Sequence, residues 1–183
     1  MLKKPTDHER MRAEIDKLIE ALELPELNKQ FLQARWLEQV IWMEGKARDA
    51  VRWYYALRLT TIIGGVIVPA LVSLNFGGSV GTMTQAITFT VSLLVALSAA
   101  VEEFFHYGER WRHYRRTAEL LKSEGWQFFQ LSGAYANQTY AQAYPAFAAR
   151  VEELSREEVD VYMTQVVREK KEKDDKTGSP SAI

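Results

Sequence analysis

The segment from Leu59 to Val101 constrains this chain most, because none of its 43 residues is Asp, Glu, Lys, Arg or His. A soluble domain rarely leaves so long a run uncharged, since its surface has to be wetted. The run is about twice as long as the ~20 apolar residues that one helix needs to cross a bilayer. It is interrupted once, by the turn-forming residues 77–79. We therefore expect two membrane-spanning helices joined by a tight turn.

The charges beside this segment predict its orientation. Spans over residues 59–76 and 80–101 would be roughly 27 and 33 Å long, close to the ~30 Å of a hydrocarbon core. Basic residues are concentrated beside the end of each span that lies away from the turn, whereas the turn carries no charge. The positive-inside rule then predicts a multi-pass protein of the cell (inner or plasma) membrane, with both termini cytoplasmic. A buried hairpin within a soluble bundle is the alternative.

Composition and motifs give little indication of catalysis. The net charge of −1 does not suggest nucleic acid as a partner, and the absence of Cys excludes disulfides and thiolate chemistry. The chain contains no Gly-rich phosphate loop, no H-E-x-x-H and no G-x-S-x-G. The amino-terminal residues contain no apolar stretch typical of a cleaved signal peptide. We expect no enzyme activity, no cofactor and no bound metal.

The regions outside the spans have helical patterns, apart from a polar tail. An amphipathic helix is expected within residues 1–28, and a cytoplasmic helix over 29–58 leads into the first span. A cytoplasmic helical region follows over 102–169, with one helix continuing from the second span to about Leu131. A loop or broken helix over 134–145, a last helix from Ala146 and a polar, disordered tail over 170–183 complete the chain.

Two apolar seams indicate how the helices pair. Each follows alternating steps of three and four residues, the pattern that buries one face of a helix against a partner. The first seam comprises Trp36, Val40, Met43, Ala47, Ala50, Tyr54 and Leu57, and the second comprises Phe104, Tyr107, Trp111, Tyr114, Ala118, Leu121, Gly125 and Phe128. The sequence therefore predicts an all-α membrane protein, in which a two-helix transmembrane hairpin extends into a cytoplasmic antiparallel helical bundle.

A polar line along the second span supplies the candidate site residues. Polar side chains in a span usually face protein or water instead of lipid. If several copies surround an axis, this line would form a pore with acidic rings at its cytoplasmic mouth, which favour cations, and histidines that titrate near neutral pH. The candidates for the pore lining are Gln85, Thr88, Ser92, Val95 and Ala99, and those for the mouth or an ion-binding position are Glu102, His106, Glu109 and His113.

The alternative is that these polar groups are structural. Gln85, Thr88 and Ser92 would then form hydrogen bonds to the first span, and the mouth candidates would be a solvated helix face. The basic cluster over residues 109–116 has a similar pair of interpretations. Salt bridges to Glu38, Glu44 or Asp49 compete with contacts to anionic lipid beneath the membrane. Glu103 and His106 form a single E-x-x-H pair, whereas di-iron bundles need two.

The segment over residues 105–115, FHYGERWRHYR, carries a family resemblance. Together with the arginines that precede the first span, the glycine turn and the helix over 119–126, it resembles the SLATT group, the SMODS- and SLOG-associating two-transmembrane effectors. The resemblance covers roughly residues 30–165. It implies a helical membrane hairpin with a cytoplasmic helical part, acting as a pore-forming effector that responds to nucleotide signals. With no attached sensor domain, the trigger is expected to be a separate partner or a small ligand, and a housekeeping channel is equally compatible.

These observations predict a homo-oligomeric membrane pore or ion channel that prefers cations and is lined by the second span. Its expected partners are the lipid bilayer, further copies of the chain and inorganic cations, but no nucleic acid. The alternative is a membrane-anchored interaction or effector module, whose cytoplasmic helices bind a partner while the hairpin only anchors the protein.

Overall fold

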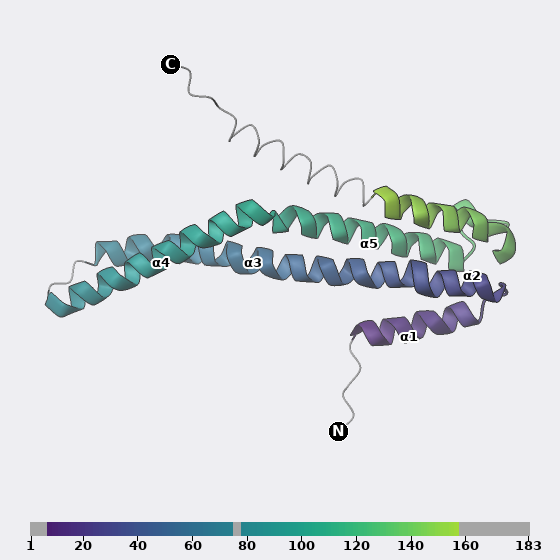
Figure 1. Cartoon of the computed structure of the whole chain (residues 1–183), viewed down its shortest axis with the longest axis horizontal. Helices are drawn as coiled ribbons and strands as arrows, with labels where there is room; N and C mark the ends of the chain where they lie inside the picture. Colours follow the sequence, from purple (N-terminus) through teal and green to yellow (C-terminus); the bar gives the residue numbers. More distant parts are fainter. Residues whose placement is uncertain (1–6, 75–77, 158–183) are drawn as a thin grey trace, which may run out of the picture. The chain divides into compact units, whose positions relative to one another are not determined.

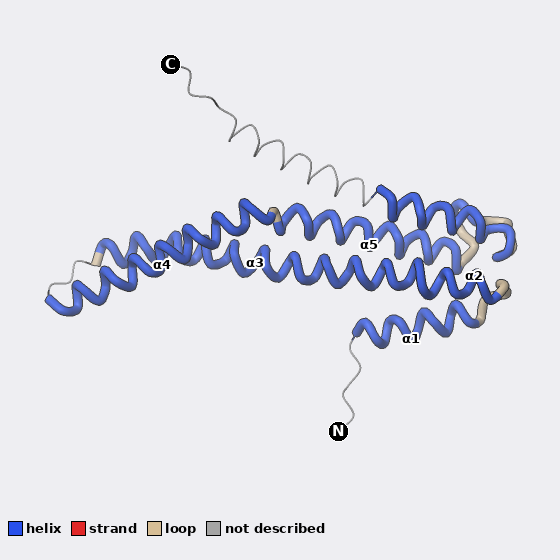
Figure 2. Tube along the Cα trace, in the orientation of Figure 1, coloured by secondary structure: helices blue, strands red, loops and turns tan. Residues whose placement is uncertain are grey.

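The computed structural model describes residues 7–74 and 78–157. All regular secondary structure in these two ranges is helical, which confirms the predicted all-α class (Figure 2). The chain forms two compact units. The bundle unit contains the described residues up to Ile41 and from Thr117 onward, and the hairpin unit is Trp42–Arg116. The expected tail over 170–183 and the centre of the expected turn lie outside the described residues.

The helices follow the predicted order closely (Figure 1). The chain is continuously helical from Glu26 to Ser73, as the sequence pattern predicts for the segment that leads into the first apolar stretch. The elements are α1 (Asp7–Glu20), α2 (Glu26–Phe31), the π-helix η1 (Leu32–Leu37), α3 (Glu38–Ser73), α4 (Gly78–Phe105), α5 (Tyr107–Phe129) and the short 3-10 helix η2 (Gly133–Tyr135). Residues 140–157 are also helical.

The bundle unit is built around one tryptophan. The Trp36 indole Nε1–H donates a hydrogen bond to the Leu121 carbonyl oxygen at 2.9 Å, and the ring lies directly against Gly125 of α5. Phe147 packs beside the same indole and stacks on Phe128, with ring centroids 4.4 Å apart. The large side chains of this cluster are all buried: Trp36, Leu121, Phe128 and Phe147. The two predicted seams therefore face each other here.

The π-helical geometry of η1 explains how this core is filled. A π-turn contains more residues than an α-turn, so residues five apart can share one face of the helix. Leu32 and Leu37 are both buried, together with Trp36, the third buried residue of η1. An uninterrupted α-helix would turn Leu32 and Leu37 to different faces. The local change in helical geometry thus aligns a wider apolar face with the core.

In the expected loop or broken helix over 134–145, the first half has no α-helix, whereas the structure is α-helical from residue 140, before the expected start of the last helix at Ala146. The Thr139 N–H donates to Gln142 Oε1 at 2.9 Å, and the Gln142 N–H donates to Thr139 Oγ1 at 3.4 Å. This reciprocal arrangement is a capping box, which starts a helix by satisfying backbone donors at its first turn. The helix therefore begins before Pro145 and not after it.

In the hairpin unit, α4 lies antiparallel along the second part of α3 (Figure 1). Gly64 of α3 is buried and contacts the Val95 side chain of α4, so the two helices approach closely at this point. Aromatic pairs continue the contact between α3 and α5: Trp53 stacks on Tyr107 with centroids 6.2 Å apart, and Tyr54 stacks on Trp111 at 6.5 Å. Tyr54 also covers Gly108.

The second long helix is broken at one residue, which corrects the expected continuous helix to about Leu131. His106 separates α4 from α5 and has a left-handed φ of 49°. Its N–H donates to the Glu102 carbonyl at 2.9 Å, and its own carbonyl accepts the N–H of Glu109 at 3.0 Å. His106 therefore terminates one helix and begins the next. The left-handed conformation costs an L-residue with a side chain roughly 1–2 kcal/mol.

We predict that two glycine substitutions change stability in opposite directions. Gly125→Ala places a Cβ in the Trp36 ring and should lower the free energy of unfolding by about 1–3 kcal/mol. Gly45→Ala, at a helical position with no atom within 4 Å of the added Cβ, should raise it by about 0.5–1 kcal/mol. Thermal or denaturant unfolding in detergent measures both. A stabilised Gly125→Ala variant would contradict the described Trp36 packing.

We also predict a ranking of residues at position 106. His106→Gly and His106→Asn should be at least as stable as the wild type, because both residues tolerate a left-handed φ. His106→Val should unfold more easily by about 1–2 kcal/mol, because β-branched residues rarely adopt positive φ. The same detergent unfolding assay compares the three variants. Equal stability of the Val and Gly variants would show that the break does not depend on the left-handed conformation.

Candidate functional site

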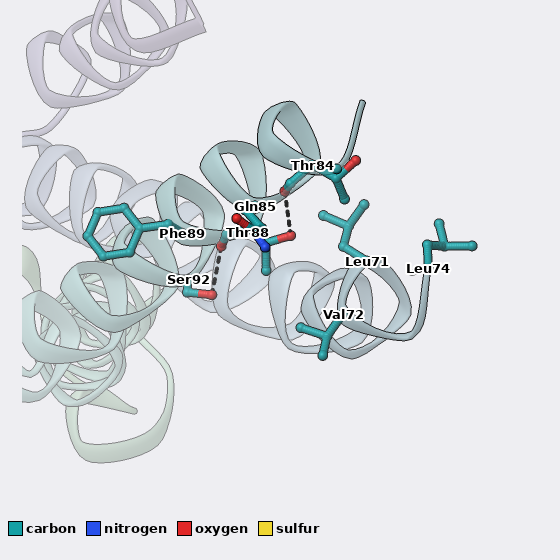
Figure 3. Close-up of a pocket in the computed structure, with 9 residues that line it drawn as sticks. Leu71, Val72, Leu74, Thr84, Gln85, Thr88, Phe89 and Ser92 are labelled. Carbon is teal, nitrogen blue, oxygen red and sulfur yellow. Dashed lines mark hydrogen bonds between the residues drawn. The ribbon is translucent and has the colours of Figure 1, made fainter. Parts of the chain in front are cut away.

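The polar residues of α4 line a cavity in the hairpin unit (Figure 3). The cavity has a volume of about 400 Å³ and lies between the end of α3 and the first half of α4. On the α4 side four of the six lining residues have oxygen-bearing side chains, and on the α3 side the lining is aliphatic. The lining comprises Gly81, Thr84, Gln85, Thr88, Phe89 and Ser92 of α4 with Leu71, Val72 and Leu74.

The hydroxyl groups of this cavity use their protons within their own helix. Thr84 Oγ1 donates to the Val80 carbonyl at 2.9 Å, and Thr88 Oγ1 donates to the Thr84 carbonyl at 2.8 Å. Ser92 Oγ donates to the Thr88 carbonyl at 2.8 Å. The alternative expectation, that Thr88 and Ser92 donate hydrogen bonds to the first span, is therefore wrong. Because a hydroxyl has one proton and two lone pairs, these oxygens face the cavity as acceptors.

Gln85 differs from its hydroxyl neighbours. Its side chain is exposed, and its amide forms no hydrogen bond with any residue that the structure describes. The amide carries two N–H donors and a carbonyl acceptor. It lies among side chains that are otherwise aliphatic, aromatic or internally bonded. Gln85 is thus the cavity residue with unused hydrogen-bonding capacity of both kinds.

The remaining predicted lining residues lie elsewhere. Val95 contacts Gly64 and forms part of the contact between α3 and α4, so it packs within the hairpin. Ala99 is exposed and does not line the cavity. Thr84 also lines the cavity, although it is not among the predicted lining residues. It lies one turn before Thr88 on the same face of α4. A search in strict four-residue steps from Ser92 would have found it, because residues four apart stack on one helix face.

The four predicted mouth residues are distributed around the helix break. Glu102 is half-buried in the last turn of α4, and His106 forms the break itself. Glu109 is exposed in the first turn of α5, and His113 is half-buried one turn later. Among the described residues, no group of three or more His, Cys, Asp or Glu side chains could hold a metal ion. The arrangement within one chain therefore brings no divalent-ion site together from His106, Glu109 and His113.

The apolar side chains of the hairpin point outward. Two helical segments, Glu26–Ser73 and Val80–Phe105, are long and apolar enough to cross a membrane, by length and composition alone. Only 6% of the most apolar window of each segment is buried within the described structure. Val66 and Phe89, for example, are each 70% exposed. The hairpin is therefore not a buried core of this chain.

The clearest pKa shifts occur in the bundle unit, far along the sequence from the cavity. Burial, followed by a 2.5 Å hydrogen bond to Glu124 Oε1, raises the pKa of the Tyr135 hydroxyl. Hydrogen bonds from Arg35 Nε (2.7 Å) and Nη2 (3.0 Å) lower the pKa of Glu152. These contacts connect the bundle's helices.

The comparison with known proteins identifies one family. Residues 38–143 match the family described as a protein of unknown function, DUF4231. This range is more than half of the chain and includes the whole hairpin, the helix break and α5. No curated protein and no solved structure matches the chain. On the strength of this match, the chain belongs to the DUF4231 family.

Proposed function

We propose that the protein spans a membrane and assembles as a homo-oligomer that conducts ions, with a preference for cations, through a pore lined by α4. The observation that carries this proposal is the polar cavity between α3 and α4. It lies in a part of the described chain where many apolar side chains are exposed. An oxygen-lined cavity within an apolar hairpin has little use in an anchor, whereas it suits a path for water or ions.

Insertion of the hairpin into a bilayer accounts for its exposed surface. Leu59, Ile63 and Val66 on α3 are 51–70% exposed, and Met83, Phe89 and Leu94 on α4 are 55–70% exposed. Lipid tails would cover these side chains without a protein partner. The backbone of both segments is helical, so most of its polar groups are satisfied internally, as a spanning segment requires. Pro69 inside α3 has no N–H and leaves one backbone carbonyl of that helix without its helical donor. The basic flanks favour cytoplasmic termini.

The cation preference rests on the direction in which the polar groups point. Thr84, Thr88 and Ser92 have used their hydroxyl protons, and their oxygen lone pairs remain for an ion. The carboxylates of Glu102 and Glu109 follow toward the cytoplasmic end and form no ion pair within the described residues. Acceptor oxygens and acidic rings both stabilise a partly dehydrated cation.

Oligomer formation follows from the size of the hairpin and from Gln85. Two helices cannot enclose a water path across a bilayer, so several copies are needed around an axis. An unsatisfied amide in hydrocarbon costs several kcal/mol. Contact with α4 of another copy, or with water in the pore, would satisfy the Gln85 amide. The resemblance to the SLATT group is consistent with such an assembly and suggests that a separate signal triggers it.

A second candidate function is a membrane-anchored interaction module. The bundle unit has its own core of buried aromatic residues, and the large apolar side chains that it exposes include Leu27 (76%) and Trp126 (48%). Such side chains favour binding to another protein. In this alternative the hairpin could be replaced by an unrelated membrane hairpin without loss of function.

We predict a specific labelling pattern for the topology, which the natural absence of cysteine makes simple to measure. Val80→Cys should react with a membrane-impermeant maleimide in intact cells that express the protein. Lys46→Cys and Arg116→Cys should react only after the membrane is permeabilised. All three positions bear exposed side chains. Reaction of all three variants in intact cells, or of none after permeabilisation, would contradict the proposed topology.

We predict that Thr88→Val and Thr90→Val affect ion flux differently. Both threonines donate to the carbonyl four residues earlier in α4, but only Thr88 lines the cavity. Thr88→Val removes one acceptor oxygen at nearly constant volume. Such a contact is worth ~1 kcal/mol, so potassium flux into proteoliposomes should change by about fivefold. Thr90→Val should leave the flux unchanged.

Two outcomes would contradict the pore assignment. If wild-type proteoliposomes show no ion flux at any tested pH, voltage or ligand condition, the protein is not a channel under those conditions and the interaction module is favoured. If flux is present but Thr88→Val and Thr90→Val behave alike, the conducting path is not lined by this face of α4. Circular dichroism of each reconstituted variant establishes that both remain helical.

A further inference from the structure

A local excess of positive charge surrounds the inner end of the hairpin, although the whole chain has a net charge of −1. Residues 46–58 and 102–116 contain eight basic side chains and four acidic ones. The acidic residues are Asp49, Glu102, Glu103 and Glu109, and the basic residues are Lys46, Arg48, Arg52, Arg58, Arg110, Arg112, Arg115 and Arg116. All belong to the hairpin unit. The basic side chains of these two ranges outnumber the carboxylates, so this part of the hairpin unit attracts anions.

Four of these arginines form no ion pair or hydrogen bond with any described residue: Arg52, Arg58, Arg110 and Arg112. Elsewhere in the described chain arginines pair readily. Arg12 binds Glu38, which was one of the carboxylates expected to bind the basic cluster, and Arg35 binds Glu152 at 2.7 Å. The prediction of salt bridges is therefore wrong for Glu38. The four guanidinium groups remain available.

A pair of aromatic rings, one on α3 and one on α5, lies near these arginines in the sequence. Tyr55 of α3 contacts Trp111 of α5, with ring centroids 6.5 Å apart. Arg52 and Arg58 each lie three residues from Tyr55, which makes them its neighbours on the helix surface. Arg110 and Arg112 flank Trp111 in sequence. We call Arg52, Trp53, Tyr55, Arg58, Phe104, Tyr107, Arg110, Trp111 and Arg112 the arginine–aromatic collar.

The exposed rings of the collar indicate the environment in which an anion would be bound. Trp53 is 56% exposed, Tyr55 52% and Phe104 59%, directly beside the exposed aliphatic side chains of α3 and α4. Tryptophan and tyrosine with an apolar body and a polar edge are favoured at the boundary between hydrocarbon and water. A soluble anion would leave these rings in contact with water. A lipid supplies both an acyl chain for the rings and a phosphate for the guanidinium groups.

We propose that the arginine–aromatic collar binds the phosphate headgroups of anionic lipids in the cytoplasmic leaflet. This inference rests on the membrane insertion in the proposed function, but not on ion conduction. Arginine forms bidentate hydrogen bonds with phosphate oxygens, and each basic residue near an anionic leaflet contributes favourably to binding. This segment contains fewer acidic residues than arginines, so its net charge is positive and attracts a negatively charged membrane surface.

The test measures contact between tryptophan and lipid in nanodiscs that contain equal amounts of phosphatidylglycerol and phosphatidylcholine. Bromine atoms near the glycerol end of the acyl chains quench tryptophan fluorescence on contact. Only one of the two lipids is brominated in each sample. We expect brominated phosphatidylglycerol to quench the wild type at least about twofold more than brominated phosphatidylcholine at low salt. The preference should decrease as salt is raised.

Matched variants assign the preference to the collar. Arg52→Gln with Arg112→Gln should bring the two quenching values together, whereas Arg52→Lys with Arg112→Lys should retain most of the preference. Lys17→Gln with Arg156→Gln removes the same charge from exposed positions of the bundle unit and should leave the preference unchanged. Inorganic phosphate at millimolar concentration should not compete, because the site requires the lipid surface.

The outcomes separate this inference from the proposed function. Equal quenching by the two lipids in the wild type would overturn the collar proposal while membrane insertion stands. Loss of the preference in the Lys17 and Arg156 control would also overturn it, because bulk charge would then explain the effect. Competition by free phosphate or by RNA would assign the arginines to a soluble anion. If neither lipid quenches, the membrane insertion itself is wrong.

Discussion

Close approach at glycine is the contact on which the rest of this structure depends. Gly125 receives the Trp36 indole, Gly108 lies against the Tyr54 ring, and Gly64 contacts Val95. At each point the missing Cβ lets a large side chain of the facing helix reach the backbone. Helix pairs of this kind need little polar contact to stay in register, since shape alone fixes the position of one helix along the other. The cavity and the collar are the surfaces that this pairing leaves open.

The two ends of the hairpin unit differ in how their helices pack. Toward the turn, α3 and α4 separate enough to leave a cavity, and toward the other end stacked rings hold α3 against α5. His106 lies between the apolar helix and the basic one, and its positive φ lets each helix follow its own direction. In the proposed pore, a joint at this one residue would let a change in the basic helix alter the lining helix.

The sequence pattern predicts the helices and their seams well, because periodicity reports which face is buried over many residues. It fails where one residue decides the geometry. Nothing in the composition around His106 marks a helix break, since histidine is not a helix breaker, and the capping pair Thr139 and Gln142 lies in a stretch that resembles a loop. Of the residues expected to line a pore, Thr88, Ser92 and Gln85 line the cavity and Val95 packs against Gly64, while the pore itself stays a prediction. Helical phase alone could not show this, because it does not reveal which neighbour a face meets.

The π-helix η1 has a consequence for how this chain can vary. Its wide turns act as one residue inserted into an otherwise continuous helix that runs from Glu26 to Ser73. Removal of a single residue from Leu32–Leu37 would restore α-helical winding and rotate everything before it by ~100° relative to everything after it. Leu32 and the residues before it would then turn away from the core that Trp36 anchors. A change in the length of this segment therefore disturbs the core more than a conservative exchange of one of its side chains.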